Sequence, residues 1–103
     1  MEFKRVVVTG LGALTPIGNS IPEYWDGLIN GVSGAALIKS FDTTLFKTKF
    51  ACEVKNFDAD GFLGRKDARK LDPFVQYALW STEEAVKDAG LEFDKLDTNR
   101  IGV

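Results

Sequence analysis

The sequence contains no histidine and only one cysteine, Cys52, among its 103 residues. A histidine general base is therefore excluded within this chain. A single cysteine cannot form an internal disulfide bond, which excludes the disulfide-rich scaffolds typical of small secreted domains. We therefore expect a protein of the reducing cytoplasm.

Long apolar runs and an excess of one charge sign are also lacking. The apolar run near the N-terminus, Val6 to Val8, ends at Gly10 and is too short for a signal peptide or a membrane span. Thirteen basic residues are balanced by fifteen acidic ones, for a net charge of -2. Because nucleic-acid binding needs a broad positive surface, we expect neither a membrane nor a nucleic acid as partner.

Two regular elements are predicted in the first third of the chain. Residues 3–9, FKRVVVT, are β-branched with an apolar centre, which is typical of a strand buried in a parallel sheet. Residues 20–30 carry Ser20 and Glu23 in capping-box spacing, and their apolar residues recur every three or four positions. This pattern predicts an amphipathic helix that ends at Gly31.

The middle of the chain has weaker patterns. Residues 31–49 combine small residues with turn formers and are predicted to form a loop. Residues 49–57, KFACEVKNF, alternate in polarity, which predicts a half-buried strand with Cys52 on its inward side. Residues 58–72 are predicted to form short helical turns interrupted by glycines.

The longest predicted helix lies in the last third. Asp72 is a natural N-cap, Pro73 suits the first helical position, and Gly90 is a natural C-terminal stop. Apolar residues occur on two sides of this helix, so we expect it to be covered on both. Residues 100–103 look like the start of another buried strand, and no linker divides residues 1–103. We interpret the chain as the N-terminal segment of a larger α/β domain.

The glycine-rich turn after the first strand superficially resembles a phosphate-binding loop. Gly10 and Gly12 fit a dinucleotide fingerprint, but its third glycine position is occupied by Thr15. Pro16 disfavours helical geometry at Thr15, and the next helix signal comes only at Ser20. We therefore predict a structural turn in which the glycines permit a positive φ or close packing.

Five stretches in order carry a family resemblance: VVVTGLGALTPIGN, YW..L..GVSG, FDTTLFKTKFACEVKNF, RKDARKLDPFVQYAL and EEAVKDAGL...NRIGV. Together they resemble the N-terminal part of the β-ketoacyl-acyl-carrier-protein synthases, most of all the elongating type II enzymes of bacterial fatty-acid synthesis. The resemblance covers the whole chain but only about a quarter of a typical member. It implies an α/β, thiolase-like fold of alternating helix and sheet layers, of which this chain is part of the first half, in a homodimeric enzyme.

The resemblance also implies an acyltransferase chemistry. Members take the acyl group onto a cysteine at a helix N-terminus, and two histidines assist decarboxylation of malonyl-acyl-carrier protein and the condensation that follows. None of these three residues matches a position between 1 and 103, so no catalytic residue is assigned and the chain alone is expected to be inactive. Polyketide ketosynthases and non-catalytic chain-length factors share this N-terminal pattern and remain alternatives.

Cys52 has two interpretations. It could be a nucleophile, but the chain has no histidine to activate it. As an inward residue of an alternating strand it behaves as a small buried hydrophobe. The resemblance agrees with the second interpretation, because it places Cys52 away from the nucleophile motif.

A cationic run, which we define as Arg65, Lys66, Arg69 and Lys70, stands out in an acidic chain. These four residues lie on one face of a helix, and with Asp67 they give a local charge of +3. The run is either a solvated face or a docking surface for an acidic partner. The resemblance implies docking of acyl-carrier protein, because Lys66, Arg69 and Lys70 match the family's docking positions and Arg65 is adjacent to them.

The aromatic residues of the two longer helices could line a ligand site, but at helical spacing they are more often core. They are Tyr24, Trp25, Phe74, Tyr77 and Trp80. Carboxylate pairs such as Glu83 with Glu84 lack the company of other metal ligands. We expect no metal and no cofactor.

Overall fold

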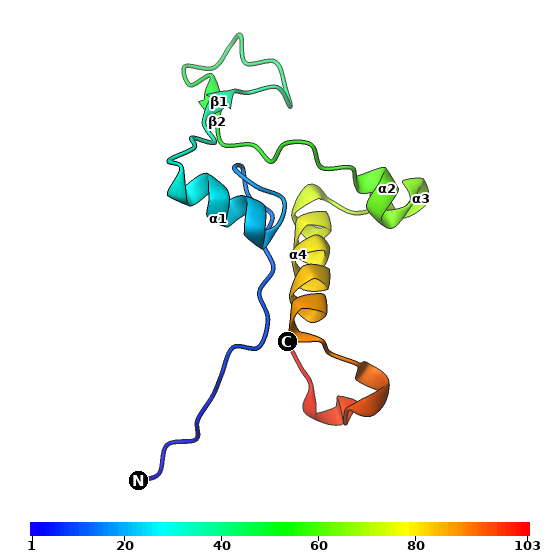
Figure 1. The fold of residues 1–103 in the computed structure, drawn as a ribbon. Coiled ribbons are helices and arrows are strands. Elements are labelled where there is room, and N and C mark those ends of the chain that lie inside the picture. Colours follow the sequence, from blue (N-terminus) through cyan, green and yellow to red (C-terminus); the bar gives the residue numbers. More distant parts are fainter.

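Four helices and a two-stranded ribbon make up the computed structural model, which describes residues 1–103 (Figure 1). In chain order these are α1 (Ile21–Ile29), β1 (Ala36–Leu37), β2 (Phe50–Ala51), α2 (Ala59–Leu63), α3 (Arg65–Ala68) and α4 (Pro73–Ala89). Two 3₁₀ turns follow, at Phe93–Lys95 and Thr98–Arg100. No helix is long and apolar enough to cross a membrane.

Helix α1 forms where the capping signals predict it. The Ser20 hydroxyl accepts a hydrogen bond from the Glu23 N–H (3.3 Å), and the Glu23 carboxylate accepts one from the Asn19 N–H (2.7 Å). These contacts satisfy backbone donors at the helix start. At the other end Gly31 has a φ of +63°, a conformation that glycine adopts without strain. Both predicted ends are confirmed.

Helix α4 also has its predicted bounds. Pro73 occupies the first helical position, and Gly90 adopts the left-handed conformation that ends the helix. Asp72 caps the helix through its backbone, because its carbonyl accepts from Val75 and Gln76 while its side chain makes no capping bond. The predicted helical turns before it are confirmed as α2 and α3.

The predicted strand over residues 49–57 is wrong in extent. Only Phe50–Ala51 pairs, antiparallel to Ala36–Leu37, and Cys52 is exposed and not inward-facing. The reason lies in Glu53, whose carboxylate accepts from the Lys39 and Ser40 backbone N–H groups. A side chain thus takes the place of the backbone ladder that would have lengthened the ribbon.

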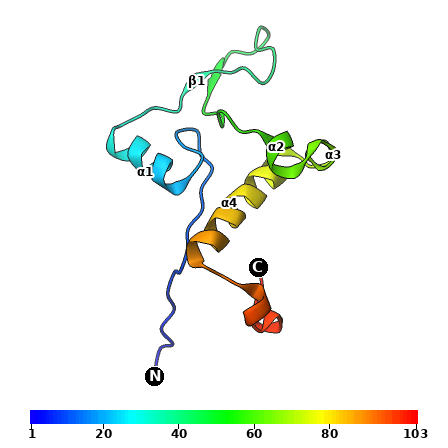
Figure 2. The same cartoon turned by 45° about the vertical axis from the view of Figure 1, so that its right-hand side comes forward.

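The predicted buried strands at residues 3–9 and 100–103 are also wrong for this structure. Residues 3–9 form no strand, and Val6 and Val8 are 89% and 80% exposed. Residues 101–103 are likewise exposed and unpaired. A strand requires a neighbouring backbone to satisfy its N–H and C=O groups, and no other segment of residues 1–103 lies beside either one. In both views residues 1–8 extend away from the helices (Figures 1 and 2).

The arrangement leaves most apolar side chains uncovered. The radius of gyration is 17.7 Å, against about 13 Å for a compact domain of this length, and three of 103 residues are buried. Two sides of α4 are apolar as expected, but they are covered only in part within the chain, since Phe74 is 71% exposed. The helices are therefore set by local signals and by a few long-range contacts to α4.

Candidate functional site

The glycine-rich turn packs directly against α4. A Cβ added at Gly12 would lie 1.8 Å from the Ser81 carbonyl oxygen, and one at Gly10 would lie 2.4 Å from the Ala85 carbonyl oxygen. Neither glycine has a positive φ. Of the two predicted roles, close packing is therefore confirmed and the positive φ is not.

The backbone donors around this turn are occupied by carboxylates of α4. Glu84 accepts from the Ala13 N–H (2.8 Å) and from the Ile21 N–H (2.7 Å), and Asp88 accepts from the Leu11 N–H (2.9 Å). A phosphate-binding loop needs such N–H groups free and aimed at the phosphate. Here they already bind two negative groups, which would repel a phosphate. The turn is structural, in agreement with the sequence.

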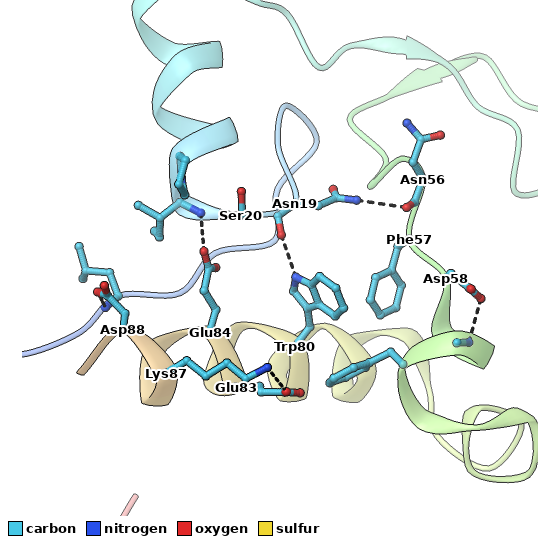
Figure 3. Close-up of a pocket in the computed structure, with 15 residues that line it drawn as sticks. Asn19, Ser20, Asn56, Phe57, Asp58, Trp80, Glu83, Glu84, Lys87 and Asp88 are labelled. Atoms are coloured by element: carbon cyan, nitrogen blue, oxygen red, sulfur yellow. Dashed lines mark hydrogen bonds and ion pairs between the residues drawn. The ribbon is translucent and has the colours of Figure 1, made fainter. Parts of the chain in front are cut away.

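A hollow of about 970 Å³ opens between α4, residues 19–22 and residues 56–62 (Figure 3). In it Trp80 meets Phe57 and Phe62 edge to face, with ring centroids 5.5 and 4.9 Å apart, and the two phenylalanine rings are tilted to each other at 6.4 Å. The Trp80 indole N–H donates to the Asn19 carbonyl (2.8 Å), which fixes the ring against the segment before α1. The hollow is thus an aromatic groove between segments distant in sequence.

The aromatic residues predicted as core are only partly so. Tyr77 packs on Phe57 at a centroid distance of 5.4 Å, and Trp80 belongs to the same cluster. Trp25 (63% exposed) and Phe74 are exposed, so the core prediction is wrong for them in this chain. They lie on helix faces that no other part of residues 1–103 covers.

The rim of the hollow is acidic and its groups are already engaged. Glu83 forms an ion pair with Lys87, and Asp58 accepts from the Gly61 N–H. No group of three or more potential metal ligands occurs in the structure. The side chains of the hollow thus supply aromatic packing and a negative rim.

The cationic run lies on α3 and on the turn after it. All four of its side chains are exposed, while Ala68, between them in sequence, is buried. Arg69 continues the helical path with φ −74° and ψ −21°, and Lys70 donates its N–H to the Asp67 carbonyl (3.0 Å). The ion pairs of the chain are Glu83–Lys87 and Glu92–Lys95, so the positive charge of the run is not neutralised within the chain.

Cys52 lies on the extended segment after β2, away from both the hollow and the cationic run. It is exposed, whereas the alternation predicted it buried. The chain contains no histidine beside it. The side chain is therefore accessible but has no general base to activate it.

Two carboxyl groups have shifted pKa values: Asp42, which lies in the β1–β2 loop, and Glu53, which follows β2 and binds the backbone of that loop. A hydrogen bond from the Ser40 side chain, with others from backbone N–H groups, lowers the pKa of Glu53. Hydrogen bonds from Thr44 lower the pKa of Asp42. Both carboxylates order the β1–β2 loop through these hydrogen bonds, and neither lines the hollow or belongs to the cationic run.

Comparisons with known proteins identify the family. The family model described as "Beta-ketoacyl synthase, N-terminal domain" matches residues 3–103. The 3-oxoacyl-[acyl-carrier-protein] synthase 2 proteins of Vibrio cholerae and of a Synechocystis species are each 47% identical over all 103 residues. That of Staphylococcus aureus is 44% identical over 99% of the chain. The chain spans 25% of the length of these relatives.

Solved structures agree with this. The structure of the ishigamide ketosynthase/chain length factor aligns with 87% of this chain and with 22% of its own chain, at a TM-score of 0.75 and 39% identity. A type II polyketide ketosynthase in complex with its acyl-carrier protein, AntDE:AntF, aligns with 95% of this chain and with 24% of its own chain. The TM-score is 0.70 and the identity 31%. The helices of this chain thus follow the thiolase-like fold of ketosynthases. The chain belongs to the β-ketoacyl synthase family, and its residues 3–103 match the model of the family's N-terminal domain.

Proposed function

We propose that this chain is the N-terminal portion of a 3-oxoacyl-acyl-carrier-protein synthase 2 and that its cationic run docks the acyl-carrier protein. The full enzyme would condense an acyl-enzyme thioester with malonyl-acyl-carrier protein and release CO₂ during fatty-acid elongation. The identity of 44 to 47% to synthases of this name, over essentially the whole chain, supports the assignment. A cytoplasmic homodimer with layered helices and sheets is part of the same proposal.

The observation that carries the docking proposal is the separation of charge on the surface. The cationic run is exposed and unneutralised, whereas the rim of the hollow is lined by Glu83, Glu84 and Asp88. An acidic partner is attracted to the first surface and repelled by the second. Acyl-carrier proteins present an acidic helix, and one of the matched ketosynthases is in complex with its acyl-carrier protein.

The condensation itself would be carried out by residues outside residues 1–103. The chain has no histidine, and its cysteine lacks an activating base. Its contribution is to receive the carrier protein and to support the scaffold. The chain alone is therefore expected to have no condensing activity.

A second candidate function is that of a non-catalytic chain-length factor. This second candidate is supported by the 39% identity to a structure titled ketosynthase/chain length factor. The two differ at the nucleophile, which must be a cysteine at a helix N-terminus for covalent acyl transfer. A glutamine in its place in the full-length sequence would identify the chain-length factor.

The docking proposal is tested by charge reversal in the full-length synthase. With Lys66→Glu and Arg69→Glu combined, two attractive pairs are lost and two repulsive ones are introduced. At about 0.5 kcal/mol for each exposed pair, the sum is roughly 2 kcal/mol. We expect the apparent KM for acyl-carrier-protein substrates to rise about 30-fold, with a weaker dependence on salt and little change in kcat.

The matched control reverses two other exposed lysines, Lys39→Glu with Lys47→Glu, which changes the net charge equally but in the β1–β2 loop. This variant should leave KM unchanged. An acyl-pantetheine thioester, which has no acidic helix, should be used equally well by all variants. If charge reversal in the cationic run left carrier-protein kinetics unchanged, the run would be a solvated face.

Cys52→Ala should leave turnover of the full-length synthase nearly intact. The side chain is exposed, and the chain contains no histidine to activate it. The measurement is the steady-state rate of condensation together with the amount of acyl group bound to the protein. Loss of acyl transfer in this variant would show that Cys52 is the nucleophile after all.

A further inference from the structure

Gln76 is the one buried polar residue of the chain, with 9% of its surface exposed. It lies in the first turns of α4, and its side-chain amide faces back toward the preceding connection. The Nε2 group donates to the Ala68 carbonyl (2.8 Å) and to the Leu71 carbonyl (3.0 Å). Both donors of the amide are therefore used, one by the last residue of α3 and one by the connection between α3 and α4.

These two acceptors bracket the second half of the cationic run. Ala68 is the last residue of α3, and Arg69 and Lys70 lie between it and Leu71. A helix of four residues is too short to be stable by itself, and the carbonyls at its end have no partner within the helix. The Gln76 amide supplies that partner and connects α3 to the much longer α4.

We propose that Gln76 is a positioning residue for docking of the acidic carrier protein. Its amide holds the backbone of residues 68–71 in one conformation. The Arg69 and Lys70 side chains are then presented from a rigid turn. This inference rests on the proposed function of the cationic run. A docking surface that is already ordered loses less conformational freedom on binding, so removal of the amide weakens docking without removing any charge.

The test is Gln76→Met in the full-length synthase, which keeps the length and volume of the side chain but removes both donors. We expect the apparent KM for acyl-carrier-protein substrates to rise roughly tenfold, with kcat and the use of an acyl-pantetheine thioester unchanged. The matched control is Ser81→Ala, which removes a side-chain hydrogen bond to the Tyr77 carbonyl in the same helix, away from the cationic run. It should leave all three quantities unchanged.

Coupling to the cationic run is measured in a double-mutant cycle. In the background of Lys66→Glu with Arg69→Glu, the effect of Gln76→Met on KM should nearly disappear, because little favourable docking remains to be oriented. If the effects of the substitutions on KM were fully additive, the inference would be wrong. It would also be wrong if Gln76→Met impaired the use of the carrier-protein and pantetheine substrates equally. If Gln76→Met gives no soluble enzyme, Gln76→Asn, whose shorter amide cannot reach both carbonyls, replaces it with the same expectations.

The cycle separates this inference from the proposed function. If charge reversal raises KM and Gln76→Met does not, the docking proposal stands and the positioning role is wrong. If charge reversal has no effect on carrier-protein kinetics, both are wrong. A raised KM in both variants, with coupling between them, supports both.

Discussion

Alanine in place of Gly12 should destabilise the full-length synthase by about 3 kcal/mol or more. The added Cβ would lie 1.8 Å from the Ser81 carbonyl oxygen and 2.9 Å from the Ala85 backbone nitrogen. Both are backbone atoms of α4, so no side chain can rotate away to relieve the overlap. Since ordinary contacts between heavy atoms are about 3.5 Å or longer, the turn must move by more than about 1 Å.

That movement has a second cost. The turn is held to α4 by the Ala13 N–H, 2.8 Å from the Glu84 carboxylate, and by the Leu11 N–H, 2.9 Å from Asp88. A shift of the turn lengthens these hydrogen bonds beyond useful range and leaves the carboxylates without donors. The measurements are the midpoint of urea unfolding and the yield of soluble protein.

Gly31→Ala is the control for loss of glycine without a steric clash. Nothing lies within 4 Å of a Cβ at Gly31, although its φ of +63° makes a side chain there unfavourable by about 1 to 2 kcal/mol. The Gly12 variant should therefore have the lower midpoint of the two. Equal midpoints would mean that the turn does not pack on α4 in the full-length protein.

The sequence predicts those parts of the fold that depend on neighbouring residues. The ends of α1 and α4 follow from Ser20, Pro73 and the glycines after each helix, because capping is decided within a few residues. The strand at residues 3–9 has the right composition but depends on a partner that residues 1–103 do not provide. Composition alone cannot show whether such a partner is present.

The candidate site divides in the same way. The cationic run is visible in the sequence as charge, and the structure places it on the surface. The role of Gln76 depends on the path of the chain between α3 and α4, and that of Glu84 depends on contacts across more than 60 residues. The sequence hints at the role of Glu84 only through its spacing: Glu84 and Asp88 are four positions apart, on one face of the helix that packs against the glycine-rich turn.

Removal of the Glu84 carboxylate should have an effect comparable to that of the clash at Gly12. Its Oε1 accepts from the Ile21 N–H at 2.7 Å, and its Oε2 accepts from the Ala13 N–H at 2.8 Å. Ile21 is the first residue of α1, so Glu84 both caps that helix and holds the glycine-rich turn. Hydrogen bonds to a charged group each contribute about 1.5 to 3 kcal/mol, and we expect Glu84→Ala to cost about 3 kcal/mol or more.

Two variants give this prediction its contrast. Glu84→Gln keeps one acceptor oxygen, so it should lose about half as much stability as Glu84→Ala. Glu83→Ala changes the neighbouring residue, whose exposed ion pair with Lys87 contributes at most about 1 kcal/mol. The urea unfolding midpoint of the full-length protein should therefore be highest for Glu83→Ala, intermediate for Glu84→Gln and lowest for Glu84→Ala. If the midpoint of Glu84→Ala were no lower than that of Glu83→Ala, the Glu84 carboxylate would not be joining the turn, α1 and α4. Packing alone, at the contact of Gly12 with Ser81, would then have to hold these segments together.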